Sequence, residues 1–283
     1  MPGAVDLHSH TTASDGTYAP RELVREAVRR GVRVLAVTDH DSTEGLAEAM
    51  DEAAGHPGLT VVPGIEINCD VEGGEIHVLG YLMDYQAPWF AEFCRDQRTE
   101  RRARIHRITE RLAELGKPVD PEEVFALVRE GSAGRPHVAQ VMVRRGYVKT
   151  VREAFDRYLA AGKPANVPRK KLTPEDAVRL IRRAAGVPVF AHPGLADKDE
   201  IIPGLIAAGL MGIECLYGEH NPGQTARYLD LCRRHGLVAT GGSDFHGPQV
   251  RAGARLGSPT VPLATWDALQ AKAAEARRSV PTA

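Results

Sequence analysis

The residues of this chain most able to do chemistry are histidines and carboxylates placed where predicted strands end. The segment Asp6-Leu7-His8-Ser9-His10 comes at the end of a short apolar strand, Ala4–Leu7. Residues two apart in an extended segment project to the same side, so His8 and His10 can reach one metal ion together. A lone His-X-His pair is weak evidence, because many such pairs are incidental.

Comparable residues recur at further predicted strands along the chain. Those strands and residues are Val32–Val37 with His40, Leu59–Ile65 with Glu66, Ile76–Leu82 with His77, Val187–Ala191 with His192, and Leu237–Thr240 with Asp244 and His246. Six of the eleven histidines fall at such places. A single histidine there is more often a hydrogen-bonded structural residue, and a single carboxylate is often a helix cap. Active sites of parallel α/β folds gather at the carboxyl ends of strands, so the set as a whole predicts a metal centre.

The donor types indicate both the metals and the reaction. Histidine and carboxylate ligands without thiolate suit Zn²⁺, Mn²⁺ or Fe²⁺. There are more donors than one ion needs, and a carboxylate such as Glu66 can bridge two ions, so we expect two to three divalent ions. Clustered ions activate water at neutral pH and clamp the oxygens of a phosphoryl group. We therefore predict phosphate ester hydrolysis, in which a hydroxide that bridges two ions attacks phosphorus; the sequence assigns no general acid.

The elements that must position these residues alternate between strand and helix in the first and last thirds of the chain. Pro20 opens a helix that Gly31 closes, and Thr173 is a plausible N-cap for another. Further helices are predicted from about Ser42 and over Ile201–Ala208 and Gln224–His235. Such alternation predicts an α/β fold with a mostly parallel sheet, either open or closed into a barrel.

The middle of the chain breaks this rhythm, because residues 88–171 show helical patterns and no convincing strand. Residues 95–171 hold 19 Lys and Arg against 10 Asp and Glu, whereas the whole chain has a net charge of −1. We interpret 1–87 and 172–283 as the catalytic domain and 88–171 as a basic, helical, substrate-binding insertion. The alternative is that the basic residues only form solvated helix faces.

Other bulk features give no sign of a membrane or of an obligate protein partner. The four cysteines form no Cys-X-X-Cys pair, which argues against a zinc knuckle and a disulfide framework. The N-terminal residues lack the pattern of a signal peptide, and the apolar runs are far shorter than a membrane span. We expect a cytoplasmic protein.

The ordered motifs resemble the PHP superfamily, the polymerase and histidinol phosphatase group. They are His8-Ser9-His10, Thr38-Asp39-His40-Asp41, Gly64-Ile65-Glu66, Ala191-His192-Pro193 and Ser243-Asp244-Phe245-His246. The resemblance covers nearly the whole chain, and it implies a distorted (β/α)7 TIM-like barrel with a three-metal site.

The resemblance also implies which residues hold each metal. By position, the first metal takes His8, His10, Glu66 and Asp244, the second takes Glu66, His77 and His192, and the third takes Asp15, His40 and His246. Asp15 stands where some family members have histidine, so the third site is expected to be weaker or to prefer a harder ion.

A subgroup with a helical insertion after the fourth strand is the more similar part of this family. It includes phosphatases of nucleoside 3′,5′-bisphosphates and 5′→3′ exoribonucleases. The segment Gly134-Arg135-Pro136-His137 is similar to a phosphate-contacting element there. The Arg135 guanidinium could bind a phosphate through two parallel hydrogen bonds, and His137 could donate another. Lys170 and Lys171 could also bind substrate phosphate. The alternatives are a helix start with Pro136 at its first position and a solvated basic run.

The resemblance therefore implies hydrolysis of small nucleotides such as pAp, of the 5′ ends of short RNA, or of both. One alternative is a histidinol-phosphate phosphatase, but so small a monophosphate does not need a basic insertion. Another is a non-catalytic metal-binding PHP module, and the complete set of expected ligands argues against it.

Overall fold

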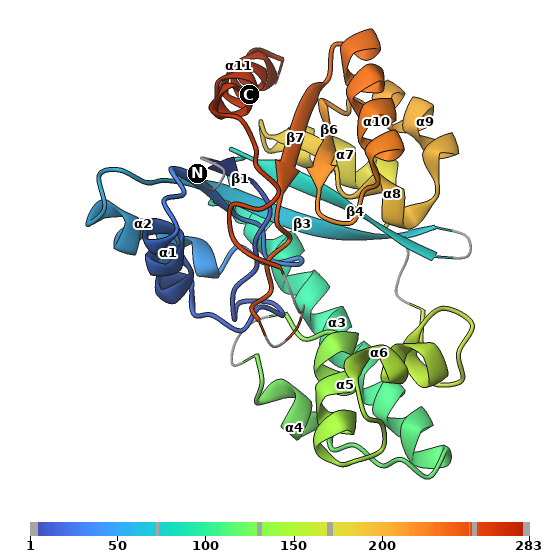
Figure 1. Cartoon of the computed structure of the whole chain (residues 1–283). Coiled ribbons are helices and arrows are strands. Elements are labelled where there is room, and N and C mark those ends of the chain that lie inside the picture. Colours follow the sequence, from blue (N-terminus) through green and yellow to red (C-terminus); the bar gives the residue numbers. More distant parts are fainter. Residues whose placement is uncertain are drawn as a thin grey trace.

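Seven strands form one sheet in chain order in the computed structural model, which describes residues 5–71, 74–128, 132–168, 172–248, 250 and 254–279. The strands are β1 (Val5–Asp6), β2 (Val34–Val37), β3 (Thr60–Val71), β4 (Gly74–Tyr81), β5 (Val187–Phe190), β6 (Gly212–Tyr217) and β7 (Val238–Gly242). The backbone N–H of Leu7 donates to the carbonyl of Gly241 at 3.1 Å, which joins the first strand to the last. The sheet is thus a nearly closed barrel (Figure 1), and the predicted distorted α/β barrel is confirmed.

Helices pack around this barrel, and their ends follow local sequence signals. They are α1 (Pro20–Arg29), α2 (Gly45–Ala54), α7 (Pro174–Arg183), α8 (Pro193–Ala196), α9 (Ile202–Ala208), α10 (Pro222–His235) and α11 (Leu263–Arg278), with a 3₁₀ turn at Asp199–Ile201. The Thr173 hydroxyl accepts the N–H of Asp176 at 3.1 Å, as predicted for an N-cap. Gly31, at φ +73°, ends α1 as predicted, because glycine adopts this backbone conformation without strain.

One expectation about the third strand was wrong. The sheet is mostly parallel, as predicted, and β4 alone runs antiparallel to its neighbours β3 and β5. β3 continues to Val71, which places Glu66 in the middle of the strand and not at its end. The cause is that β3 and β4 pair from Gly64–Tyr81 to Val71–Gly74 and form a long two-stranded ribbon.

The described residues within 88–128 and 132–168 extend below the barrel in Figure 1 as a lobe, and their regular structure is helical throughout, as predicted. Its elements are α3 (Pro88–Glu114), α4 (Pro121–Phe125), α5 (Arg135–Arg144), α6 (Val151–Ala154) and a π-helical turn, Phe155–Leu159. One hydrophobic cluster in this lobe draws only on residues 105–167. The first turns of α3 pack instead on the barrel through Phe90 and Cys94, so α3 connects the two parts.

The closed edge between β1 and β7 leaves no room for a side chain at Gly242. A Cβ atom there would lie 2.5 Å from both the backbone N and the Cβ of His8. We predict that Gly242→Ala lowers the free energy of unfolding by about 1–3 kcal/mol, a typical cost of overpacking. Gly58→Ala is the matched control, because nothing lies within 4 Å of its Cβ position. Urea denaturation of both variants measures the difference, and equal stabilities would contradict the tight closure.

Candidate metal centre

The segment after β1 presents two histidines to the interior of the barrel mouth. His8 and His10 are both fully buried. The Nε2 atom of each lies 3.2 Å from Glu66 Oε2, and these atoms lie 3.4 and 3.2 Å from Asp244 Oδ1. The structure thus brings together the four residues expected around the first metal.

Glu66 lies at the middle of the cluster, and each of its carboxylate oxygens contacts imidazole nitrogens. Glu66 Oε1 lies 2.8 Å from His77 Nδ1 and 3.1 Å from His192 Nε2. Glu66 Oε2 lies 3.0 Å from His40 Nδ1. The residues expected around the second metal therefore meet at one oxygen of Glu66 while those of the first meet at the other. This is the arrangement that a bridging carboxylate requires.

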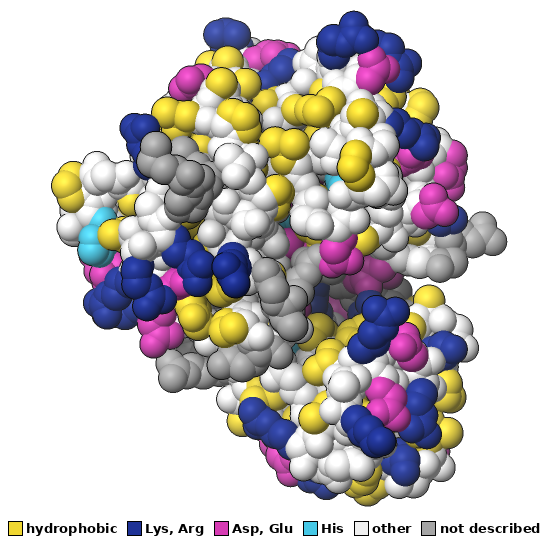
Figure 2. Space-filling model, in the orientation of Figure 1, with side chains coloured by type: hydrophobic (Ala, Val, Ile, Leu, Met, Phe, Trp, Pro, Cys, Tyr) yellow, Lys and Arg dark blue, Asp and Glu magenta, His cyan; other side chains and the backbone are white. Residues whose placement is uncertain are grey.

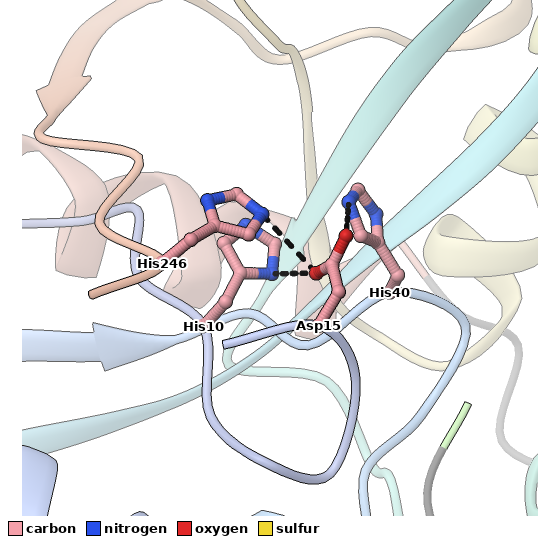
Figure 3. A group of neighbouring side chains, drawn as sticks. All are labelled: His10, Asp15, His40 and His246. Atoms are coloured by element: carbon pink, nitrogen blue, oxygen red, sulfur yellow. Dashed lines mark ion pairs between the residues drawn. The ribbon is translucent and has the colours of Figure 1, made fainter. Parts of the chain in front are cut away.

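Asp15 lies between three histidines, as Figure 3 shows. Its oxygens lie 3.1 Å from His246 Nε2, 3.8 Å from His40 Nε2 and 3.9 Å from His10 Nδ1. The loop that carries Asp15 is held by the buried carboxylate of Asp39, which accepts Thr11 N–H at 2.8 Å and Ser14 Oγ–H at 2.6 Å. The residues expected around the third metal are thus also assembled, with His10 beside them.

Several donor atoms of this cluster are buried and have no hydrogen-bond partner. They are His8 Nε2, His10 Nε2, Asp15 Oδ1, His40 Nδ1 and Glu66 Oε2. Buried polar atoms are normally hydrogen-bonded, so such a concentration needs an explanation. The donor atoms within each of three overlapping groups lie within 4.8 Å of one another. Divalent cations would supply the missing partners, and these nitrogen and oxygen donors fit them.

The shifted pKa values of the cluster also indicate a site for cations. Burial would raise the pKa of Glu66, but the surrounding histidines, His40 and His8 foremost, hold it well below its usual range. Burial alone would lower the pKa of His246, yet the carboxylates of Asp15 and Asp244 raise it to about 10. Burial, the largest cause, lowers the pKa of His40 to about 3, so that ring stays neutral beside Glu66. A cation that binds at His246 must displace its proton, so binding there is coupled to proton release.

The backbone at the cluster is strained at several non-glycine residues. His192 has φ +27°, Asp244 has φ +50° and Asp41, next to His40, has φ +49°. L-residues adopt such angles at a cost of about 1–3 kcal/mol, and the surrounding structure must impose them. His192 and Asp244 each lie two residues beyond the end of a strand, β5 and β7 respectively.

Two residues that the sequence analysis missed hold the candidate ligands in place. The fully buried carboxylate of Glu214, on β6, lies 3.0 Å from His8 Nδ1 and accepts the backbone N–H of His192 at 2.9 Å. A hydrogen bond donated by His8 Nδ1 leaves the lone pair of Nε2 free for a metal. The Tyr217 hydroxyl donates to Asp244 Oδ2 at 2.9 Å. A glutamate inside the apolar strand Gly212–Tyr217 was the available signal for Glu214.

A pocket of about 200 Å³ opens beside the cluster, between the barrel and the helical lobe. Its lining joins candidate ligands to arginines of the lobe: Asp15, His40, Asn68, Glu75, His77, Arg101, Arg104, Arg135, Pro136 and Phe155. Arg135, which the sequence predicts to bind substrate, is part of this lining and forms an ion pair with Glu75. Arg101 and Arg104, which the sequence analysis did not single out, share the lining.

The other three predicted substrate-binding residues are less informative. His137 is buried and its Nδ1 accepts the N–H of Gly134 at 3.1 Å, so it takes part in the start of α5. Burial lowers the pKa of His137. Lys170 and Lys171 lie outside the described residues, so their role stays a prediction.

We predict that Glu214→Gln weakens Mn²⁺ binding about 10- to 100-fold, the usual effect of removing a group that orients a metal-binding histidine. A glutamine can turn its NH₂ group toward His8 Nδ1 and so no longer fixes the proton there. Glu26→Gln is the matched control, because Glu26 is also a buried carboxylate but lies on α1 and pairs with Arg30. Titration calorimetry with Mn²⁺ measures both variants. Equal affinities in the two would show that Glu214 does not orient His8.

Comparison with known proteins places the chain among metal-dependent phosphoesterases of known fold. It is 35% identical over 276 residues to the 5′-3′ exoribonuclease Rnm of Escherichia coli, with 92% of each chain covered. It is 34% identical over 258 residues to the 3′,5′-nucleoside bisphosphate phosphatase of Chromobacterium violaceum, with 86% of this chain and 87% of the relative covered.

A solved structure from Bifidobacterium adolescentis, assigned as a metal-dependent phosphoesterase, superposes with a TM-score of 0.87 at 31% identity. It covers 96% of this chain and 98% of its own. The family model described as the PHP domain matches residues 6–167, and this confirms the resemblance found in the sequence motifs. The chain belongs to the PHP domain family.

Proposed function

We propose that this protein is a metal-dependent phosphoesterase that hydrolyses small nucleotides such as pAp, the 5′ ends of short RNA, or both. The observation that carries the proposal is the group of buried nitrogen and oxygen atoms around Glu66 that have no hydrogen-bond partner, beside a pocket whose lining includes arginines. Two relatives, an exoribonuclease and a nucleotide phosphatase, both act on phosphate esters, and they support the predicted enzyme class.

We assign the ligands of two to three divalent ions to the three groups described above. Mn²⁺, Zn²⁺ and Fe²⁺ all suit this mixture of imidazole and carboxylate donors. Such ions, once bound, supply an activated water at neutral pH and neutralise charge on the phosphoryl oxygens. The protein's own part is to hold the donors: Glu66 stands between two groups, and Glu214 and Tyr217 orient His8 and Asp244.

The helical lobe would bind the part of the substrate that is not cleaved. Arg135 reaches the pocket from the first turn of α5, and its guanidinium can bind a phosphate through two parallel hydrogen bonds. In the free protein this guanidinium pairs with Glu75, so an incoming phosphate must displace that carboxylate. We propose residues 88–171 as the substrate-binding insertion, and Figure 2 supports this with a hollow between the lobe and the barrel.

The two alternatives from the sequence remain distinguishable by assay. A histidinol-phosphate phosphatase would need no arginine-lined pocket, and a non-catalytic module would need no complete donor set. The described part of the chain contains no helix long and apolar enough to cross a membrane. A cytoplasmic location and the lack of an obligate protein partner stay predictions.

The test is a panel of substrates with purified protein and Mn²⁺: pAp, 5′-phosphorylated oligonucleotides and histidinol phosphate. We expect hydrolysis of one or both nucleotide substrates, two to three bound ions by elemental analysis, and loss of activity on chelation. Glu66→Ala should lower turnover by several orders of magnitude, because it removes a ligand from two ions. Activity that survives metal removal, or activity on histidinol phosphate alone, would refute the proposal.

For the substrate-binding insertion, we predict that Arg135→Ala impairs the hydrolysis of pAp much more than that of a simple aryl phosphate. A charge-assisted bidentate contact contributes roughly 1.5–3 kcal/mol, so kcat/KM for pAp should fall about 10- to 150-fold. Arg135→Lys should not restore full activity, because an ammonium cannot reproduce the planar fork.

Arg145→Ala is the matched control for this experiment. Arg145 follows the same helix and also pairs with a carboxylate, Glu123, but it is exposed to solvent. Steady-state kinetics of these variants on both substrates decide the matter. Equal losses on pAp and the aryl phosphate would place Arg135 at the cleaved phosphate or in the fold.

A further inference from the structure

Arg101 is a buried arginine of the helical lobe, and its side chain donates hydrogen bonds both to the region around the metal centre and to the lobe itself. It lies on α3, between the turns that pack on the barrel and those in the core of the lobe, and it is 7% exposed. Its Nε and Nη2 donate to Asp41 Oδ2 at 2.8 and 2.5 Å. Its Nη2 also donates to Asn68 Oδ1 at 2.5 Å, and its Nη1 donates to the carbonyl of Ala133 at 3.4 Å.

Asp41, the main partner of Arg101, joins two segments that carry candidate metal ligands. It directly follows His40, and its backbone N–H donates to the carbonyl of Glu66 at 2.9 Å. Its Oδ1 accepts the N–H of Asn68 at 3.0 Å, which leaves Oδ2 for Arg101. The carboxylate is fully buried, and a buried charge needs a partner to be tolerated. Arg101 therefore compensates the group that holds the His40 loop against β3.

Asn68 extends the same network toward the substrate pocket. A guanidinium can only donate, so Asn68 must turn its oxygen toward Arg101 and its NH₂ group the other way. That NH₂ group lies 2.7 Å from His77 Nε2 and 3.2 Å from Glu75 Oε1, and Glu75 is the ion-pair partner of Arg135. The bond from Arg101 to Ala133 also reaches the residue before Gly134, which precedes α5 and Arg135.

We propose that Arg101 is a positioning residue that fixes the helical lobe onto the metal centre, so that His40 and Glu66 on one side and Arg135 on the other keep their places. The proposal rests on the function proposed above, since it assigns Arg101 to the same site. Arg101 does not have to touch the reacting phosphate, because its hydrogen bonds are taken by Asp41, Asn68 and Ala133.

The test is Arg101→Lys, with Mn²⁺ alone as the probe of the metal centre. A lysine ammonium cannot reach all three acceptors from one position. The substitution therefore keeps the positive charge but loses the simultaneous hydrogen bonds to Asp41, Asn68 and Ala133. We expect about tenfold weaker Mn²⁺ binding in titration calorimetry. Arg102→Lys is the matched control on the same helix; Arg102 is exposed and its guanidinium lies over the ring of Phe125, so Mn²⁺ affinity should not change.

Kinetics separate this role from that of Arg135. Arg101→Lys should lower kcat for an aryl phosphate about tenfold, because it acts through the metal centre, and should lower kcat for pAp at least as much; Arg135→Ala should leave the aryl phosphate nearly unaffected. If Arg101 acts through Asp41, the two substitutions should not add. The double variant Arg101→Lys/Asp41→Asn should then have the same Mn²⁺ affinity as whichever single variant binds Mn²⁺ less tightly. Asparagine keeps the shape of Asp41 and tolerates its positive φ, which makes Asp41→Asn the alternative variant if Arg101→Lys does not fold.

Unchanged Mn²⁺ affinity in folded Arg101→Lys, or in Asp41→Asn, would overturn the proposal. Additive losses in the double variant would also overturn it, because they would separate Arg101 from Asp41. Wild-type protein that binds Mn²⁺ but hydrolyses no phosphate ester would refute the proposed function. The Mn²⁺ titrations would still decide the role of Arg101 in that case.

Discussion

The structure depends on the burial of one ionised carboxylate, that of Glu66, at the centre of the barrel mouth. An isolated buried charge is too costly for a fold of ordinary stability, so opposite charges must surround it. Five imidazole rings contact it, those of His8, His10, His40, His77 and His192. They cannot all carry positive charge, because burial and the neighbouring rings of His10 and His77 lower the pKa of His40 to about 3. Divalent cations resolve both problems, because they satisfy the carboxylate and bind neutral imidazoles.

The scaffold must then hold many donors in place against their mutual repulsion, and the two unusual parts of the barrel do this. The β3–β4 ribbon pairs Asn68 with His77 across the strands, and Glu66 lies two residues before Asn68 on the same face. The closure of β1 on β7 brings His8 and His10 to Asp244 from the opposite ends of the chain. Both devices are backbone pairings, which are stiffer than a side-chain contact alone.

Much of the fold and of the candidate site could be predicted from the sequence, because strand–helix alternation and residues near strand ends are local patterns. No direction was predicted for β4, because the third strand was expected to end at Ile65. In the structure β3 ends at Val71 and β4 begins at Gly74, and so short a connection cannot contain the crossover that parallel strands need. Groups that act through a ligand, such as Glu214 and Asn68, were missed because their role depends on contacts between segments far apart in the chain.

The arginines of the helical insertion show how contacts between distant segments could be predicted from the sequence. A net charge counts every basic residue alike and does not say which arginines become buried. The apolar positions of α3 that become buried include Ile105, Ile108 and Leu112, and Arg101 and Arg104 fall on the same face at helical spacing. An arginine on the apolar face of a helix must find buried acceptors, whereas Arg102 and Arg107 on the other face remain in solvent. The face of the helix, more than its net charge, determines which arginines reach the pocket.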